Sequence, residues 1–111
     1  MAFLKEIPEN NRNGWLKASE AGDSNAQASL GYCYEYAQGV AQDYAEAIKW
    51  YTKSAEQGNV IASGSLGIIY FKGQGVPKDY NESVKWFTKG ADKGDETCRK
   101  NLEYVKSQIG K

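Results

Sequence analysis

The chain has 111 residues, its 14 basic and 14 acidic side chains give a formal net charge of zero, and 41% of its residues are hydrophobic. The balanced charge argues against nucleic-acid binding and against a polybasic membrane patch, and no run approaches the roughly 20 apolar residues that a membrane span needs. One domain with a modest core is predicted, and residues 1–8 lack the long apolar stretch of a secretory signal, so we expect a cytoplasmic protein with no membrane insertion.

The first predicted element is the end of a helix in residues 15–22, which match residues 51–58 when the sequence is shifted by 36 positions. Ahead of it, three asparagines and Gly14 are poor helix formers. Pro8 suits the first turn of this helix, where its missing N–H costs nothing. We expect residues 1–22 to form an N-terminal half-repeat that caps a helical array, in preference to a peptide-like arm.

Residues 23–58 and 59–94 are two copies of one unit, and the same shift of 36 aligns them without a gap. Each copy contains two stretches with apolar residues at helical spacing, so each copy is predicted to be a pair of helices. Self-similarity at this period is typical of a solenoid. The apolar positions of the first copy are Ala26, Leu30, Cys33, Tyr34 and Ala37 in the first helix, and Tyr44, Ala47, Ile48, Tyr51 and Ala55 in the second.

The connection within each copy carries the residues of a helix–turn–helix. Gly39 stands where a helix C-terminus needs a left-handed residue. Asp43 then offers a side-chain oxygen to cap the next helix, and Glu46 can reach back to the backbone N–H of Asp43. The second copy repeats this arrangement. Its Gly73-Gln74-Gly75 follows a helix instead of a strand and lacks the rest of a dinucleotide-binding motif, so it is predicted to be a turn.

A glycine recurs in the middle of each predicted first helix, at Gly31 and Gly67. Glycine there costs about 1 kcal/mol relative to alanine. Its recurrence indicates a packing purpose, because bare backbone lets a neighbouring helix with a large aromatic side chain come close. Trp50 and Trp86 occupy equivalent positions in the second helices and are expected to pack against neighbouring helices.

Residues 95–111 are predicted to form a third first helix without its partner. Cys98 and Val105 fall on core positions, whereas Glu103 replaces the glycine and Lys106 replaces the tyrosine. A terminal helix whose outer side meets water loses the two residues that would receive another repeat. We therefore expect a C-terminal cap, and an array of half a repeat, two repeats and half a repeat that is complete in itself.

The recurring residues resemble the Sel-one-like repeat family, which is related to the tetratricopeptide repeat and has a slightly longer period. The shared pattern is Ala-x3-Leu-Gly-x2-Tyr, then Gly-Val-x2-Asp-Tyr, then Lys-Trp-aromatic-x-Lys-x-Ala-x2-Gly, and it holds in both copies. The resemblance covers roughly Trp15 to the C-terminus. It implies an all-α fold, a right-handed α-solenoid, which is used for protein–protein contacts.

Catalysis is not expected. The chain has no histidine, which removes histidine-based triads, most zinc sites and the commonest general base. No nucleophile motif is present and no pair of carboxylates points to a shared pocket, so we predict no enzyme, no cofactor and no metal. Cys33 and Cys98 lie two stacking steps apart, about 20 Å, which is too far for a disulfide. They are expected to be reduced and buried.

Partner binding is predicted on the faces of the first helices that point away from the second helices. These faces differ between copies while the scaffold positions are nearly fixed, so recognition is separated from fold. In helical-hairpin solenoids the first helices line the concave side, and their exposed faces form parallel ribs of one groove. The expected partner-binding residues are Asn25, Ser29, Tyr32, Glu35, Tyr36, Ile61, Ile68, Phe71, Lys72, Lys100 and Tyr104.

The alternative for these aromatic and aliphatic residues is that they only cover neighbouring ribs. We favour binding, because aromatic residues on an exposed concave surface are typical of interface cores. On this hypothesis the replacement of Tyr32 and Phe71 by alanine leaves the fold intact and removes the partner.

The predicted function is a non-catalytic protein–protein interaction module whose partner is a peptide, a helix or a toxin domain. The alternative is an immunity protein that neutralises a bacterial toxin or effector, as some small bacterial members of the family that it resembles do. A toxin gene beside the gene for this chain would favour the alternative.

Overall fold

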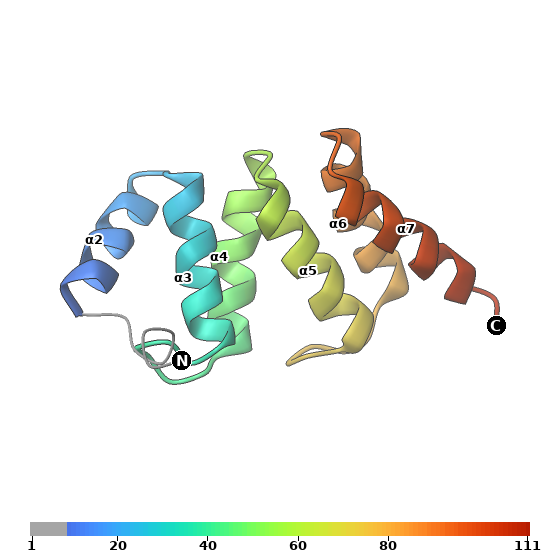
Figure 1. Cartoon of the computed structure of the whole chain (residues 1–111). Helices are drawn as coiled ribbons and strands as arrows, with labels where there is room; N and C mark the ends of the chain where they lie inside the picture. The colour runs from blue at the N-terminus through green and yellow to red at the C-terminus, as the bar shows by residue number, and fades with distance from the viewer. Residues whose placement is uncertain (1–8) are drawn as a thin grey trace.

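The computed structural model describes residues 9–111, which form six α-helices and no strand. The helices follow one another along an elongated molecule with principal extents of 46 × 24 × 24 Å (Figure 1). This arrangement is an α-solenoid and confirms the predicted fold class. The helices are α2 (Glu9–Glu20), α3 (Ser24–Glu35), α4 (Tyr44–Glu56), α5 (Val60–Lys72), α6 (Tyr80–Asp92) and α7 (Glu96–Gln108).

Helices α3 and α4 form one hairpin, and α5 and α6 form the next. Each helix packs on its neighbours in the chain, and in addition α5 contacts both α3 and α7 directly. The first helices of the hairpins and α7 therefore share one side of the solenoid, which we call the first-helix face. None of the helices within residues 9–111 has the length and apolar character that crossing a membrane requires.

The predicted close approach at the two mid-helix glycines is confirmed. A Cβ atom built on Gly31 would lie 2.6 Å from Cδ1 of Tyr51, and one built on Gly67 would lie 2.6 Å from Cε1 of Phe87. Each second helix therefore lays a buried aromatic ring directly on the backbone of its first helix. The paired helices are held at a distance that alanine would not allow.

Trp50 and Trp86 are buried, as predicted. Two lysine ammonium groups lie over each indole, and the nearer ones are Lys49 Nζ at 4.7 Å and Lys85 Nζ at 4.6 Å from the ring centroids. The ring packs inward against apolar neighbours while the lysines keep their charges in water. The second helices therefore present a charged outer face above an apolar seam.

The predicted caps of the second helices are confirmed for the aspartates only. Asp43 Oδ1 accepts a hydrogen bond of 3.1 Å from the backbone N–H of Glu46. Glu46 does not reach back, because the N–H of Asp43 already donates to the carbonyl of Tyr34 at 2.9 Å. The Glu46 carboxylate instead pairs with Lys49 at 3.1 Å. The second hairpin repeats this arrangement from Asp79 onward.

The first helices end earlier than the sequence analysis placed them. Helix α3 ends at Glu35, and Ala37 already has a left-handed backbone with φ +55°, before Gly39 with φ +80°. In the second hairpin the equivalent of Ala37 is Gly73, which caps α5 with φ +71°. The connection therefore contains two left-handed positions, of which the sequence analysis recognised one.

Helix α2 begins at Glu9, so its first half contains the asparagines and Gly14 that argue against a helix. Packing of α2 on α3 overrides these weak propensities, because tertiary contacts supply most of the stability of a helix in a protein. The match of residues 15–22 to the end of a second helix is confirmed. Gly22 and the equivalent Gly58 each follow a helix and have a positive φ, +103° and +94°. Pro8 lies outside the described residues.

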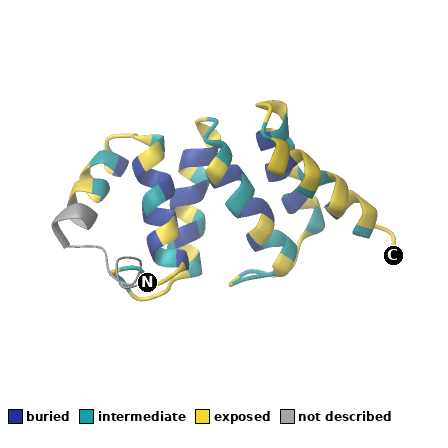
Figure 2. Ribbon diagram, in the orientation of Figure 1, coloured by how far each residue is buried: buried dark blue, intermediate teal, exposed yellow. Residues whose placement is uncertain are grey.

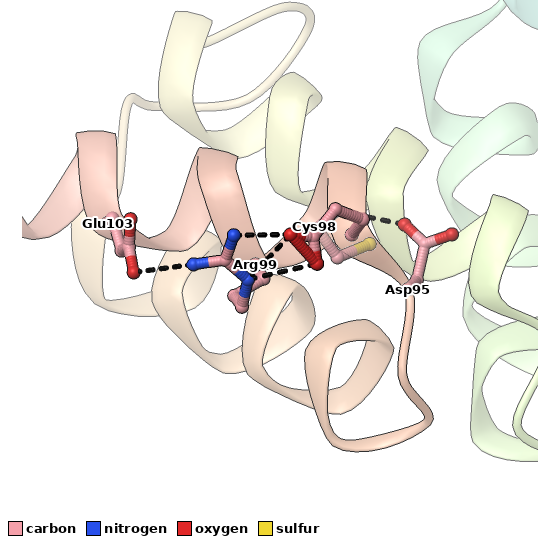
Figure 3. A network of polar contacts seen from close by, with 5 residues as sticks. Asp95, Cys98, Arg99 and Glu103 are labelled. Carbon is pink, nitrogen blue, oxygen red and sulfur yellow. Dashed lines mark hydrogen bonds and ion pairs between the residues drawn. The ribbon is translucent and has the colours of Figure 1, made fainter.

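Helix α7 carries ion pairs where α3 and α5 carry a glycine (Figure 3). Glu103 occupies the glycine position and accepts a hydrogen bond of 2.9 Å from Arg99 Nη1. Arg99 also pairs with Glu96, and all three side chains are exposed. The side of α7 that corresponds to the aromatic-covered side of α5 therefore meets water. Cys33 and Cys98 are both buried and reduced.

Candidate protein-binding groove

A groove runs along the first-helix face between α5 and α7. It consists of two adjoining clefts that share Ile68 and Asn101. The first cleft has a volume of about 210 Å³ and is lined by Ile68, Phe71, Lys72, Phe87, Asn101, Tyr104 and Val105. The second has a volume of about 300 Å³ and is lined by Val60, Ile61, Gly64, Ser65, Ile68, Asp95, Thr97, Cys98 and Asn101. We call the two clefts together the α5–α7 groove.

Five of the predicted partner-binding residues line this groove, namely Ile61, Ile68, Phe71, Lys72 and Tyr104. Ile61 is 71% exposed and Tyr104 is 55% exposed, and together with Ile68 they place three exposed large side chains on one groove. Figure 2 shows that α7 is exposed over most of its visible surface, in contrast to the buried parts of α3 and α4. Lys100 lies on α7 and is exposed, but it lines neither cleft.

Phe71 does not point away from the second helix, so this part of the sequence analysis is wrong. Its ring stacks on Tyr80 of α6 with centroids 5.1 Å apart, and it meets Tyr104 of α7 edge-on at 5.6 Å. Phe71 is half-buried against the cluster of Phe87, Cys98 and Val105. It forms the floor of the groove and also joins three helices, so its removal is expected to cost stability.

Glu35 also differs from its predicted position. Its side chain is only 5% exposed and faces α4, where the hydroxyl of Tyr51 donates a hydrogen bond of 2.7 Å to Oε1. Burial raises the pKa of the Glu35 carboxyl above its ordinary value, against the opposing effects of the hydrogen bonds from Tyr51 and Tyr36 and of the charge on Lys72. Burial and the same carboxylate raise the pKa of Tyr51. The prediction that Glu35 faces away from α4 is wrong.

The remaining predicted residues lie on α3 or at its C-cap and line neither cleft. The rings of Tyr32 and Tyr36 are exposed and approach each other with centroids 4.7 Å apart. Asn25 is exposed, and its Oδ1 accepts a hydrogen bond of 3.1 Å from Nδ2 of Asn59. Ser29 is half-buried. The α3 rib therefore presents two exposed phenol rings that are not part of the α5–α7 groove.

Several residues that line the groove are absent from the predicted partner-binding set, among them Asn101 and Phe87. Asn101 occupies the position of Ser29 and Ser65 on its rib, so repeat register could have identified it. Phe87 belongs to a second helix and reaches the groove only because it lies over the bare backbone of Gly67. The pairing of a mid-helix glycine with an aromatic residue of the second helix was the sequence feature that could have identified Phe87.

The comparison with protein families matches the Sel1 repeat at residues 24–59 and 64–95, more than half of the chain. The chain belongs to the Sel1 repeat family. Sel1 repeats are generally non-catalytic modules for protein–protein interaction. The matched residues contain the first hairpin and, apart from residues 60–63 at the start of α5, the second hairpin.

Two solved Sel1 repeat structures are similar to this chain. A Sel1 repeat protein from Oxalobacter formigenes is 35% identical with a TM-score of 0.78, over 82% of this chain and 37% of that one. The protein c5321, described as a protective antigen present in uropathogenic Escherichia coli strains, is 38% identical with a TM-score of 0.83, over 90% of this chain and 22% of that one. This chain thus spans less than half the length of either protein. The comparison with curated proteins gives no match.

Proposed function

We propose that this chain is a protein–protein interaction module and that the α5–α7 groove on its first-helix face receives a segment of the partner. The observation that carries the proposal is the groove itself, which exposes Ile61, Ile68 and Tyr104 along a continuous surface. Large apolar side chains in a contiguous exposed patch are typical of binding surfaces.

The shape of the groove supports a protein segment over a small molecule. Neither cleft exceeds the lower end of the roughly 300–1,000 Å³ that is typical of small-molecule sites. The clefts adjoin end to end along two helices, which suits an extended peptide or a helix that places one side chain in each cleft. The family supports the same interpretation, because Sel1 repeats generally bind proteins.

The test is affinity capture from the source cell with the whole chain as bait, followed by mass spectrometry. Ile68 lines both clefts and is 38% exposed, so Ile68→Asp places a charge in the middle of the groove. Leu16 on α2 is 39% exposed and lies outside the groove, so Leu16→Asp is a matched control. We expect the wild type and Leu16→Asp to retain the same partner and Ile68→Asp to lose it.

Thermal melting followed by circular dichroism checks that both variants fold. If both variants retain the partner equally, the groove is not the binding site and the partner binds another surface of the chain. If the captured partner is a toxic enzyme whose activity the chain inhibits in a purified mixture, the module is an immunity protein. A partner that keeps its activity in the complex makes it an adaptor.

A further inference from the structure

The charges on the α5–α7 groove indicate the chemistry of the segment that it binds. The apolar part of the first cleft is made by Ile68, Phe71, Phe87, Tyr104 and Val105. Among the described residues, Lys72 is the one charged residue that lines this cleft. Lys72 is the last residue of α5 and is exposed. The second cleft has one charged residue, Asp95, at the start of α7.

These two charges differ in their availability to a partner. Asp95 is committed to its own helix, because its Oδ2 accepts a hydrogen bond of 2.8 Å from the backbone N–H of Cys98. Lys72 forms no ion pair with the side chains that the structure describes, those of residues 14–111. Of the two charged groups that line the groove, the ammonium group of Lys72 is therefore the one that can pair with a charge on the partner.

The acid on which the charge of Lys72 acts, Glu35, is turned toward another helix. Glu35 is buried, and its carboxylate accepts a hydrogen bond from the hydroxyl of Tyr51 on α4, outside the groove. The two residues equivalent to Lys72 on the neighbouring ribs, Tyr36 and Gln108, are uncharged. A single cation thus stands beside the first cleft, and no acidic residue is among the described residues that line this cleft.

Resting on the proposed function, we propose that the α5–α7 groove selects a protein segment in which a large apolar side chain is accompanied, within about two residues, by an acidic side chain. The apolar side chain enters the cleft of Ile68, Phe71 and Tyr104, and the carboxylate pairs with Lys72. The spacing follows because Lys72 lines the same cleft and an extended chain advances about 3.3–3.6 Å per residue.

The test is selection of phage-displayed random dodecapeptides on the immobilised full chain. The wild type is expected to enrich peptides with an aromatic or large aliphatic residue and an Asp or Glu within two positions of it. The peptides that the Lys72→Glu variant enriches are expected to keep the large apolar residue and to carry Lys or Arg in place of the acidic residue. Lys106→Glu is the control, because Lys106 is exposed on α7 outside the groove and the charge change is the same.

A synthetic copy of one selected acidic peptide gives the quantitative test by fluorescence anisotropy. Lys72→Gln is expected to weaken binding by up to about fivefold, the range of an exposed ion pair. It should also remove most of the dependence of binding on salt, since exposed charges are screened by salt. Ile68→Asp should abolish binding.

Two results would overturn the inference and leave the proposed function standing. One is enrichment of apolar peptides with no acidic preference that still require Ile68, and the other is an acidic preference that Lys72→Glu retains. A selection that enriches no peptide would also overturn it, because the groove then takes no short linear segment, while affinity capture reports on the proposed function independently.

Discussion

The two hairpins share their backbone geometry and differ in the side chains that join their helices. In the first hairpin, Glu35 of α3 accepts a hydrogen bond from Tyr51 of α4. The equivalent residues of the second hairpin are Phe71 and Phe87, which belong to one apolar cluster. In both, the ring on the second helix lies on a mid-helix glycine. The glycine sets the helix spacing, and the residue opposite decides whether that site is polar or apolar.

The two hairpins also differ in the contact that fills the space beside the second helix, near the start of the first helix. In the first hairpin the hydroxyl of Ser54 donates to the carbonyl of Ser24 at 2.7 Å. The second hairpin has Gly90 at the position of Ser54, and the thiol of Cys98 from α7 fills the space, 2.3 Å from where a Cβ of residue 90 would be. The same thiol lies 3.9 Å from the carbonyl of Val60, the equivalent of Ser24. The carbonyl at this repeat position is thus approached from a second helix in one hairpin and from α7 in the other.

The largest effect is expected where the hairpins agree. Trp50→Ala and Trp86→Ala should each lower the free energy of unfolding by about 3–5 kcal/mol, because each removes a buried indole. Chemical denaturation followed by circular dichroism measures both. Lys85→Ala, which removes only an exposed cation over Trp86, is the control and should cost less than about 1 kcal/mol. A loss below about 1 kcal/mol for one tryptophan alone would show that the hairpins do not share this core.

The next effect separates the hairpins at Gly90 and Cys98. Gly90→Ser should cost about 1–3 kcal/mol, because its Cβ overlaps the Cys98 thiol. Gly90→Ser combined with Cys98→Ala reproduces the Ser54 and Ala62 pair of the first hairpin, so the double variant should recover most of that loss. A double-mutant cycle by urea denaturation measures the coupling, which we expect at about 0.5–3 kcal/mol. Additive losses would mean that the two residues do not compensate each other.

A smaller effect is expected at the end of α3. Ala37 holds a left-handed backbone that costs a non-glycine residue roughly 1–2 kcal/mol, while its equivalent is Gly73. Ala37→Gly should therefore stabilise the protein, by up to about 1 kcal/mol after the added flexibility of the unfolded chain is subtracted. Gly73→Ala should destabilise it. Equal and opposite changes in melting temperature would confirm that the two connections share one geometry, and a loss of stability in Ala37→Gly would contradict it.

The smallest effect is a pH dependence confined to the first hairpin. The pKa of Glu35 is raised above 4.5 in the folded protein, so the folded state holds this proton more tightly than the unfolded state. Wild-type stability should therefore fall relative to Glu35→Gln as the pH rises from about 4.5 through the raised pKa, and the difference should then level off. Urea midpoints of both proteins across this pH range measure it. A difference that changes in the opposite direction would show that Tyr51, Tyr36 and Lys72 outweigh the cost of burial.

The groove was predicted from the sequence in part. The helical spacing and the repeat register placed Ile61, Ile68, Lys72 and Tyr104 on one face, and the structure brings these side chains to the same groove. The register gave the wrong direction for Glu35 and Phe71. Both lie in the last turn of a first helix. A long aromatic side chain of the partner helix reaches each of them, Tyr51 from the middle of α4 and Tyr80 from the start of α6.

The sequence by itself determined the helical hairpins, their period, the capping aspartates and the two glycines that receive an aromatic ring. These features repeat because each depends on local hydrogen bonding or on contacts at a fixed offset, which a periodic sequence displays directly. Only the tertiary structure decided that α5 and α7 leave a groove between them, that Phe71 forms its floor and that Glu35 is buried. Those outcomes depend on the distances between helices of different repeats, and these are set by the size of side chains such as Cys98 and Phe87, which periodicity does not encode.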